Sequence, residues 1–245
     1  MTILSVHQSQ TSQLYWVADN VIAGGFPPVS RALRDPNGLL AIGGDLTSAT
    51  LLDAYRQGIF PWYSSGQPIL WWSPNPRCVL ELENLKISRS LGKTLRKKIY
   101  SVTFNGCFDR VIQSCAKPRR GHNETWLTPE MSAAYRQLHR LGHAISVETW
   151  HEDALAGGLY GICIGKVFFG ESMFSLQADA SKVALVALVR ELARKNFRII
   201  DCQVHSRHLQ SLGATPMARD LFVNLLDHYC QPVIVHDWPG TGELV

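Results

Sequence analysis

The second half of the chain carries the pattern that most restricts the fold. Three β-strands are predicted there in succession, each bounded by polar or glycine-containing turns: 144–150, 155–164 and 167–169. A helix is predicted over 180–196, because Leu185, Leu188 and Leu192 recur at helical spacing, and a strand follows over 198–204. An antiparallel meander followed by a helix and a further strand predicts an α+β fold.

Capping and turn residues divide the rest of the chain. The first 80 residues are rich in Pro, Gly and Trp, which predicts short elements separated by turns. Thr47 is the predicted N-cap of a helix that ends at Gly58. Thr128 and Pro129 begin a second helix, which ends at Gly142. Further short elements are predicted at 101–116 (a strand and a helix), 206–212 and 219–229 (a helix each).

Length alone allows one large domain or two small ones. The 245 residues are 46% hydrophobic and 18% charged, which excludes a disordered chain. No apolar run approaches the roughly 18 residues that cross a bilayer, and the first residues do not resemble a signal peptide, so we expect a cytoplasmic protein. The six cysteines form no CxxC pair, which predicts free thiols. We expect a small N-terminal domain, made of 1–77 and 78–120, and a larger C-terminal domain at 121–245.

Positive charge is concentrated in one segment. Residues 77–120 hold 11 Lys and Arg against three acids, a charge of +8, and the rest of the chain is at −4. This asymmetry is typical of polyanion binders, although a solvated basic face without a partner has the same composition. The run 86–98 has six cations and no acid, so we favour nucleic acid. The candidate contacts are Lys86, Arg89, Lys93, Arg96, Lys97, Lys98, Arg119 and Arg120.

Two acidic residues stand in apolar surroundings. Asp201 and Gln203 lie two positions apart on the last predicted strand, so both are expected on one face, with Cys202 on the other. Glu171 follows a run of apolar residues and raises the same question. A buried carboxylate needs a partner or a function, and this indicates a reactive site. The alternative is the polar face of an edge strand.

Motifs for other chemistries are missing or incomplete. No glycine-rich phosphate loop opens a helix, and the sequence has no G-x-S-x-G nucleophile motif. Cys202, His205 and His208 are spaced like metal ligands, but no fourth ligand stands out, so no metal is expected. Trp126, close to Arg119 and Arg120, is either a core anchor or a platform on which a base stacks.

These residues fall within a longer series of stretches, at 36–45, 58–62, 69–77, 125–128, 157–161, 170–175, 180–182, 200–204 and 211–214. In this order the stretches closely resemble the leucyl/phenylalanyl-tRNA–protein transferases. The resemblance extends from about residue 26 to residue 226.

The resemblance implies a fold and a reaction. It implies a C-terminal domain with the topology of the GCN5-related acetyltransferases. The implied reaction moves Leu or Phe, and Met less well, from aminoacyl-tRNA to the N-terminal Arg or Lys of an acceptor protein. Under the N-end rule, that product is marked for degradation. No cofactor and no membrane are implied, and we expect a monomer.

The resemblance also implies roles for single residues. The attacking amine is assigned to Asp201 and Gln203, and stacking on the terminal adenosine is assigned to Trp126. Glu171 is a candidate for reading the basic N-terminal residue of the acceptor. The pocket for the aminoacyl side chain is expected from Leu159, Met173, Leu185, Leu188 and Ile200.

The implied chemistry is plausible on general grounds. The aminoacyl ester is already activated, so neither ATP nor a metal is required. The nucleophile is an α-amine with a pKa of about 7.7–8.0, which needs only modest help to lose a proton. We expect Gln203 to accept a hydrogen bond from this amine, with Asp201 supplying negative charge that polarises or positions it.

Two rival functions stay open. An acetyltransferase that uses acyl-CoA shares the implied fold, but the segment 176–181, where its diphosphate would bind, has neither Gly nor Arg. A non-catalytic RNA-binding module would account for the basic segment, yet it leaves the acids in apolar surroundings unexplained.

Overall fold

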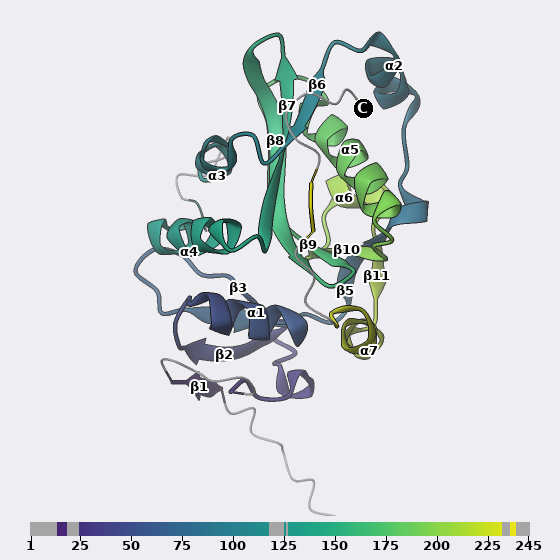
Figure 1. Cartoon of the computed structure of the whole chain (residues 1–245). Coiled ribbons are helices and arrows are strands. Elements are labelled where there is room, and N and C mark those ends of the chain that lie inside the picture. Colours follow the sequence, from purple (N-terminus) through teal and green to yellow (C-terminus); the bar gives the residue numbers. More distant parts are fainter. Residues whose placement is uncertain (1–13, 19–24, 118–124, 126, 232–235, 239–245) are drawn as a thin grey trace, which may run out of the picture.

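A seven-stranded mixed sheet forms the centre of the computed structural model, which describes residues 14–18, 25–117, 125, 127–231 and 236–238 (Figure 1). The strand order is β11-β5-β10-β9-β8-β7-β6, and within it only β9 and β10 pair in parallel. The strands are β5 (Arg77–Glu81), β6 (Ser101–Phe104), β7 (Ala144–His151), β8 (Ala154–Ile164), β9 (Val167–Ser175), β10 (Ile199–Gln203) and β11 (Thr215–Met217).

Helices cover both faces of this sheet. One face carries α5 (Ala180–Arg194), with α2 (Arg89–Lys97) packed against it, and the other carries α3 (Phe108–Cys115) and α4 (Pro129–Arg140) (Figure 1). The two faces bury separate apolar clusters, one under α5 and one under α3 and α4. The C-terminal helices are α6 (Arg207–Ser211) and α7 (Arg219–Tyr229).

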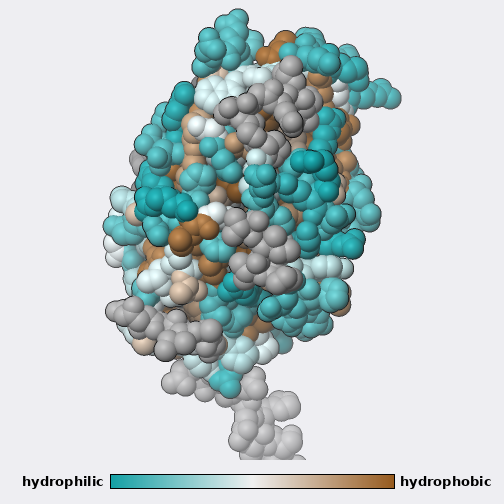
Figure 2. Space-filling view, viewed as in Figure 1, coloured by the Kyte–Doolittle hydropathy of each residue, from teal (hydrophilic) through white to brown (hydrophobic). Residues whose placement is uncertain are grey.

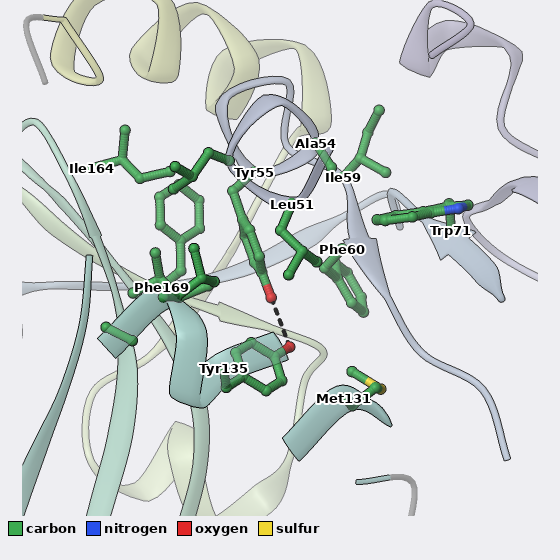
Figure 3. Close-up of a cluster of buried hydrophobic side chains, with 14 of the residues drawn as sticks. Leu51, Ala54, Tyr55, Ile59, Phe60, Trp71, Met131, Tyr135, Ile164 and Phe169 are labelled. Atoms are coloured by element: carbon green, nitrogen blue, oxygen red, sulfur yellow. Dashed lines mark hydrogen bonds between the residues drawn. The ribbon is translucent and has the colours of Figure 1, made fainter. Parts of the chain in front are cut away.

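The N-terminal region forms a second, four-stranded sheet. Its order is β1-β2-β4-β3, from β1 (Tyr15–Val17), β2 (Leu39–Gly43), β3 (Phe60–Pro61) and β4 (Leu70–Trp72). Helix α1 (Ser48–Arg56) lies between this sheet and α4, and its Tyr55 packs near Leu51 and Phe60 (Figure 3). Two short 3₁₀ turns complete the described elements, at Val29–Arg31 and Leu82–Asn84.

The predicted α+β class is confirmed, and so are both capped helices. The Thr47 hydroxyl accepts the backbone N–H of Thr50 at 3.3 Å, and that of Thr128 accepts the N–H of Met131 at 3.3 Å. The meander, helix and strand follow in the predicted order. Strand β9 is longer than predicted, because Gly170 also pairs with β8 and residues 172–175 continue the pairing after a register shift at Glu171.

The sheets divide the chain differently from the predicted domains. We expected 78–120 to belong with the N-terminal region, but β5 and β6 are strands of the large sheet. The reason is that both pair with strands far along the chain, β5 with β10 and β6 with β7. The change of sheet therefore falls close to residue 76.

The surface is largely hydrophilic on the face seen in Figure 2, with small apolar patches between polar ones. Within the described part of the chain, no helix combines the length and the apolar character needed to cross a membrane.

Candidate active site

A cavity of about 410 Å³ lies beside β10, bounded by β8, β9, α5 and α6. Its wall is mostly apolar. Leu159 and Met173 are cross-strand partners, and Ile200 pairs with Phe168, so the side chains of each pair stand on the same face of the sheet and line the cavity together. A cavity lined in this way suits a small apolar group. All the side chains expected in the aminoacyl pocket line it: Leu159, Met173, Leu185, Leu188 and Ile200.

Glu171 and Gln203 form a polar patch in the same cavity. The Gln203 side-chain Nε2 donates to Glu171 Oε1 at 3.0 Å. The hydroxyls of Tyr55 and Tyr135 donate to Oε1 at 2.8 Å and to Oε2 at 2.6 Å. Glu171 is thus held by three neutral donors, and the side-chain oxygen of Gln203 accepts no hydrogen bond from any described residue.

The two tyrosine hydroxyls lie 2.9 Å apart, which the dashed line of Figure 3 marks. Each hydroxyl has one proton, so when both donate to an ionised Glu171 no proton remains between them. A protonated Glu171 supplies the missing proton, because it can donate to one tyrosine, which then donates to the other. Burial raises the pKa of Glu171 to about 7, partly opposed by the hydrogen bonds from Tyr135, Tyr55 and Gln203. Glu171 therefore titrates near neutral pH.

Asp201 lies on the other side of β10 from the cavity, so the prediction that it shares a face with Gln203 is wrong. It is fully buried and forms a two-pronged ion pair with Arg77, Nε to Oδ1 at 2.8 Å and Nη2 to Oδ2 at 2.6 Å. Arg77 Nη1 also donates to the backbone oxygen of Gly58 at 3.0 Å. The guanidinium lies over the rings of Phe60 and Phe222, 4.7 and 4.8 Å from their centroids. Asp201 is committed to this ion pair.

A β-bulge at the end of β10 explains the difference. Asp201 pairs with Val79 and Gln203 with Cys78, so two residues of β10, Cys202 and Gln203, oppose one residue of β5. Gln203 takes a left-handed backbone conformation with φ of +59°. Both Cys202 and Gln203 therefore line the cavity. Asp201 Oδ1 accepts the backbone N–H of Gln203 at 2.9 Å, which makes Asp201 a positioning group for Gln203.

Three residues of this site were missed from the sequence. Arg77 was counted with the basic surface, because its charge does not reveal a partner 124 residues away. Tyr55 and Tyr135 lie within the helices predicted after Thr47 and Thr128, but no role was predicted for their hydroxyls. Their helical spacing predicts burial, and a buried tyrosine hydroxyl needs a partner, so that requirement was the available signal.

The basic run lies on the outside of the molecule. Lys86, Arg89, Lys93, Arg96, Lys97 and Lys98 are all exposed, on α2 or beside it. The structure gives none of these six an ion pair with a described residue. Arg119, Arg120 and Trp126 lie outside the described residues.

A metal site needs several ligand side chains close together. Across residues 14–18, 25–117, 125, 127–231 and 236–238, no three or more His, Cys, Asp or Glu side chains come together in a way that could hold an ion. His205 and His208 are exposed, and Cys202 is half-buried.

Known proteins give a consistent match over nearly the whole chain. Family models described as "Leucyl/phenylalanyl-tRNA protein transferase" and as its N-terminal domain match residues 79–227 and 44–75. A leucyl/phenylalanyl-tRNA–protein transferase of Chromobacterium violaceum is 56% identical over 82% of this chain and 86% of its own length. That of Chromohalobacter salexigens is 56% identical over 93% and 89%, and that of Pseudomonas aeruginosa PAO1 is 53% identical over 89% and 94%.

Solved structures give weaker similarities. L-PGS from Bacillus licheniformis has a TM-score of 0.40 and 9% identity, over 69% of this chain and 56% of that one. A GCN5-related N-acetyltransferase from Kribbella flavida has a TM-score of 0.36 and 8% identity, over 68% and 59%. At these TM-scores the similarity assigns no function.

Proposed function

The chain belongs to the leucyl/phenylalanyl-tRNA–protein transferase family, and we propose the course of its reaction from that membership. It is an aminoacyltransferase that acts with leucyl- or phenylalanyl-tRNA and a protein. We infer that Met is a poorer donor and that the acceptor begins with Arg or Lys. We also infer that the product is marked for degradation in the cytoplasm.

The aminoacyl side chain occupies the apolar cavity. The wall formed by Leu159, Leu188 and Ile200 accepts an uncharged side chain, and burying a Leu or Phe side chain contributes about 1.5–3 kcal/mol. A side chain seated there leaves the ester of the aminoacyl-tRNA beside Gln203. Holding the ester and the incoming amine in register supplies much of the rate.

Gln203 orients the attacking amine. Its amide nitrogen is fixed by Glu171 at 3.0 Å, which leaves the amide oxygen as an acceptor facing the cavity. The neutral α-amine donates to this oxygen and attacks the ester carbonyl. The new peptide bond forms, the bond from the carbonyl carbon to the tRNA ribose oxygen breaks, and the amine proton ends on the ribose hydroxyl. Asp201 acts only through the backbone N–H of Gln203.

Glu171 binds the cationic side chain of the acceptor. An Arg or Lys head group beside Glu171 favours its ionised form, in which the Tyr55 and Tyr135 hydroxyls both donate to the carboxylate. This recognition depends on the positive charge of the head group and not on the forked shape of a guanidinium. Arg and Lys are therefore both accepted.

The exposed cations of α2 bind the tRNA backbone. Six positive side chains without ion-pair partners among the described residues offer contacts to several phosphates. Trp126 is proposed to stack on the terminal adenosine, as the family resemblance implies.

Binding of acyl-CoA at the start of α5 is disfavoured by the local hydrogen bonds. The first backbone N–H groups of α5 are already used, Ala180 by Gln177 O at 3.3 Å and Ser181 by Ser175 Oγ at 3.2 Å. Asp179 precedes them and adds negative charge. A diphosphate at this position would lose those donors and meet a carboxylate.

The observation that carries the proposal is the Glu171–Gln203 pair within an apolar cavity. The test gives the wild-type protein Leu-, Phe-, Met- or Ala-tRNA with peptides that begin with Arg, Lys, Ala or Glu, and mass spectrometry identifies the products. We expect Leu and Phe on the Arg and Lys peptides, little Met, and no product from Ala-tRNA. Equal transfer to the Glu peptide, or acetylation by acetyl-CoA instead, would contradict the proposal.

A further inference from the structure

Cys78 and Cys202 face each other across two neighbouring strands. In the antiparallel register Asp201 pairs with Val79 and Gln203 with Cys78, so Cys202 is the extra residue of the bulge and lies beside Cys78. Two residues of β10, Cys202 and Gln203, therefore oppose the single residue Cys78 of β5. Both cysteines lie on the face that carries the apolar cluster under α5.

The two thiols interact directly. The Cys202 thiol is within hydrogen-bonding reach of the Cys78 sulfur, and this contact lowers the pKa of Cys78 and raises the pKa of Cys202 well above its usual value. Cys78 is 1% exposed, whereas Cys202 is half-buried and lines the cavity. A small oxidant that enters the cavity therefore meets the Cys202 sulfur, and the thiol with the lowered pKa, Cys78, lies directly behind it.

Three of the other cysteines are in less reactive surroundings. Burial raises the pKa of Cys107 to about 11 and that of Cys230 to about 12, and it raises the pKa of Cys163 further. Thiolates are the reactive form, so these three thiols react more slowly than a pair in which the pKa of Cys78 is lowered.

We propose that Cys78 and Cys202 form a reversible disulfide that switches the enzyme off under oxidising conditions, with hydrogen peroxide as the class of oxidant. Peroxide oxidises the Cys202 sulfur to a sulfenic acid, and one water is released. The Cys78 sulfur then attacks this sulfenic acid, the S–S bond forms, and a second water leaves. The two thiols lose two electrons together, and one peroxide is reduced to two waters.

The disulfide acts on the site through Gln203. Cys202 directly precedes Gln203 in the bulge, so a covalent link to β5 draws this segment towards Cys78. The hydrogen bond from Gln203 to Glu171, now 3.0 Å long, is then broken or misaligned. A displacement of this kind in a positioning group lowers the rate by about 100-fold. The loss of activity rests on the proposed role of Gln203, whereas formation of the disulfide does not.

The decisive experiment maps the cysteines of the full-length protein after treatment with hydrogen peroxide. Alkylation, digestion and mass spectrometry should find the peptides of Cys78 and Cys202 joined, with two hydrogens fewer than the separate peptides. Transfer of Leu from Leu-tRNA to an Arg-peptide should fall about 100-fold and return with dithiothreitol. Free thiols at both positions, separate oxidation to sulfinic acids, or full activity of the joined form would overturn the proposal.

Two variants distinguish inactivation by the Cys78–Cys202 disulfide from inactivation by oxidation elsewhere in the protein. Cys78→Ser removes a sulfur that does not line the cavity, so basal transfer should persist and resist peroxide. Cys107→Ser is the matched control and should stay as sensitive as the wild type. If Cys78→Ser does not fold, the peptide map of the wild type still decides. If the wild type transfers nothing, the function proposed above fails, and the map still tests the disulfide.

Discussion

Two carboxylates on neighbouring strands, Asp201 on β10 and Glu171 on β9, are shielded in different ways. Asp201 has a full positive charge beside it, because Arg77 donates to both its oxygens at 2.8 and 2.6 Å. Glu171 has only neutral donors, two tyrosine hydroxyls and one amide. The first carboxylate is therefore held in an ion pair. The second can gain and lose a proton near neutral pH.

The partner decides what each acid can do. The ion pair of Asp201 joins regions distant in sequence, because Arg77 also contacts Gly58 and lies over the rings of Phe60 and Phe222. Such a pair holds the N-terminal region and α7 against the sheet, and its fully buried carboxylate is out of reach of a substrate. Glu171 faces a cavity and has no cationic partner among the described residues. This suits a residue that meets a cation only when the acceptor arrives.

The largest expected effect comes from breaking the fixed pair. Asp201→Asn leaves the Arg77 charge buried without its partner, so the free energy of unfolding should fall by about 3–5 kcal/mol. Urea denaturation followed by circular dichroism measures it. Asp109→Asn, which removes an exposed ion pair with Arg136, is the control and should cost no more than about 1 kcal/mol. A stable Asp201→Asn protein with slow transfer would restore a direct catalytic role for Asp201.

Removing the side-chain amide of Gln203, beside Glu171, should lower the rate of transfer and not the stability of the fold. Gln203→Ala deletes the proposed acceptor for the amine, and the single-turnover rate should fall roughly 10²–10⁴-fold with saturating Leu-tRNA. Affinity for tRNA should not change. The exposed Gln210 on α6 provides the control, and Gln210→Ala should react like the wild type. Near-normal turnover of a folded Gln203→Ala protein would show that the site is wrongly assigned.

Glu171→Gln keeps the shape of the Glu171 side chain and removes its charge. With an Arg-peptide, kcat/KM should fall about 10- to 100-fold, the usual cost of losing a charge-assisted hydrogen bond. In the wild type kcat/KM should rise as the pH passes through about 7, because Glu171 then ionises, and again at about 7.7–8.0, where the α-amine of the acceptor loses its proton. The variant should keep only the second rise. An unchanged pH profile in Glu171→Gln would assign recognition of the acceptor to another residue.

The free energy of unfolding should also depend on the ionisation of Glu171, but it should fall with rising pH whereas kcat/KM rises. The pKa of Glu171 is raised by burial from 4.5 to about 7 in the folded protein, so its contribution is fully present below pH 4.5 and is lost as the pH rises through about 7. Wild type should therefore lose stability relative to Glu171→Gln over this range. Urea denaturation of both proteins at pH 5 and pH 8 measures the difference, and a constant difference would contradict the raised pKa.

The sequence predicted the regular elements better than the contacts between them. Local signals mark the helices after Thr47 and Thr128, since the cap lies within three residues of the amide it binds. The five side chains that line the cavity were expected from the family resemblance and not from any local pattern. The partner of Asp201, however, is 124 residues away, and nothing near either residue indicates it. The bulge at Gln203 depends on a left-handed backbone that glutamine seldom adopts, so strand alternation placed Asp201 on the wrong face.

The smallest expected effect concerns exposed charges that have neither an ion-pair partner, as Asp201 has, nor neutral hydrogen-bond donors, as Glu171 has, among the described residues. Lys97 and Lys98 are exposed at the end of α2, and no described acid pairs with them. Each phosphate contact contributes about 0.7–0.9 to the slope of log affinity against log salt. Replacing both residues with Glu should therefore lower that slope by up to about 2 and weaken tRNA binding most at low salt. Filter binding of Leu-tRNA between 50 and 200 mM salt, the range over which such contacts are resolved, measures it. Arg136→Glu, on α4 and already paired with Asp109, is the control that should leave the slope unchanged. If the slope stays the same in the double variant, the tRNA lies elsewhere and the six cations of this segment are a solvated face.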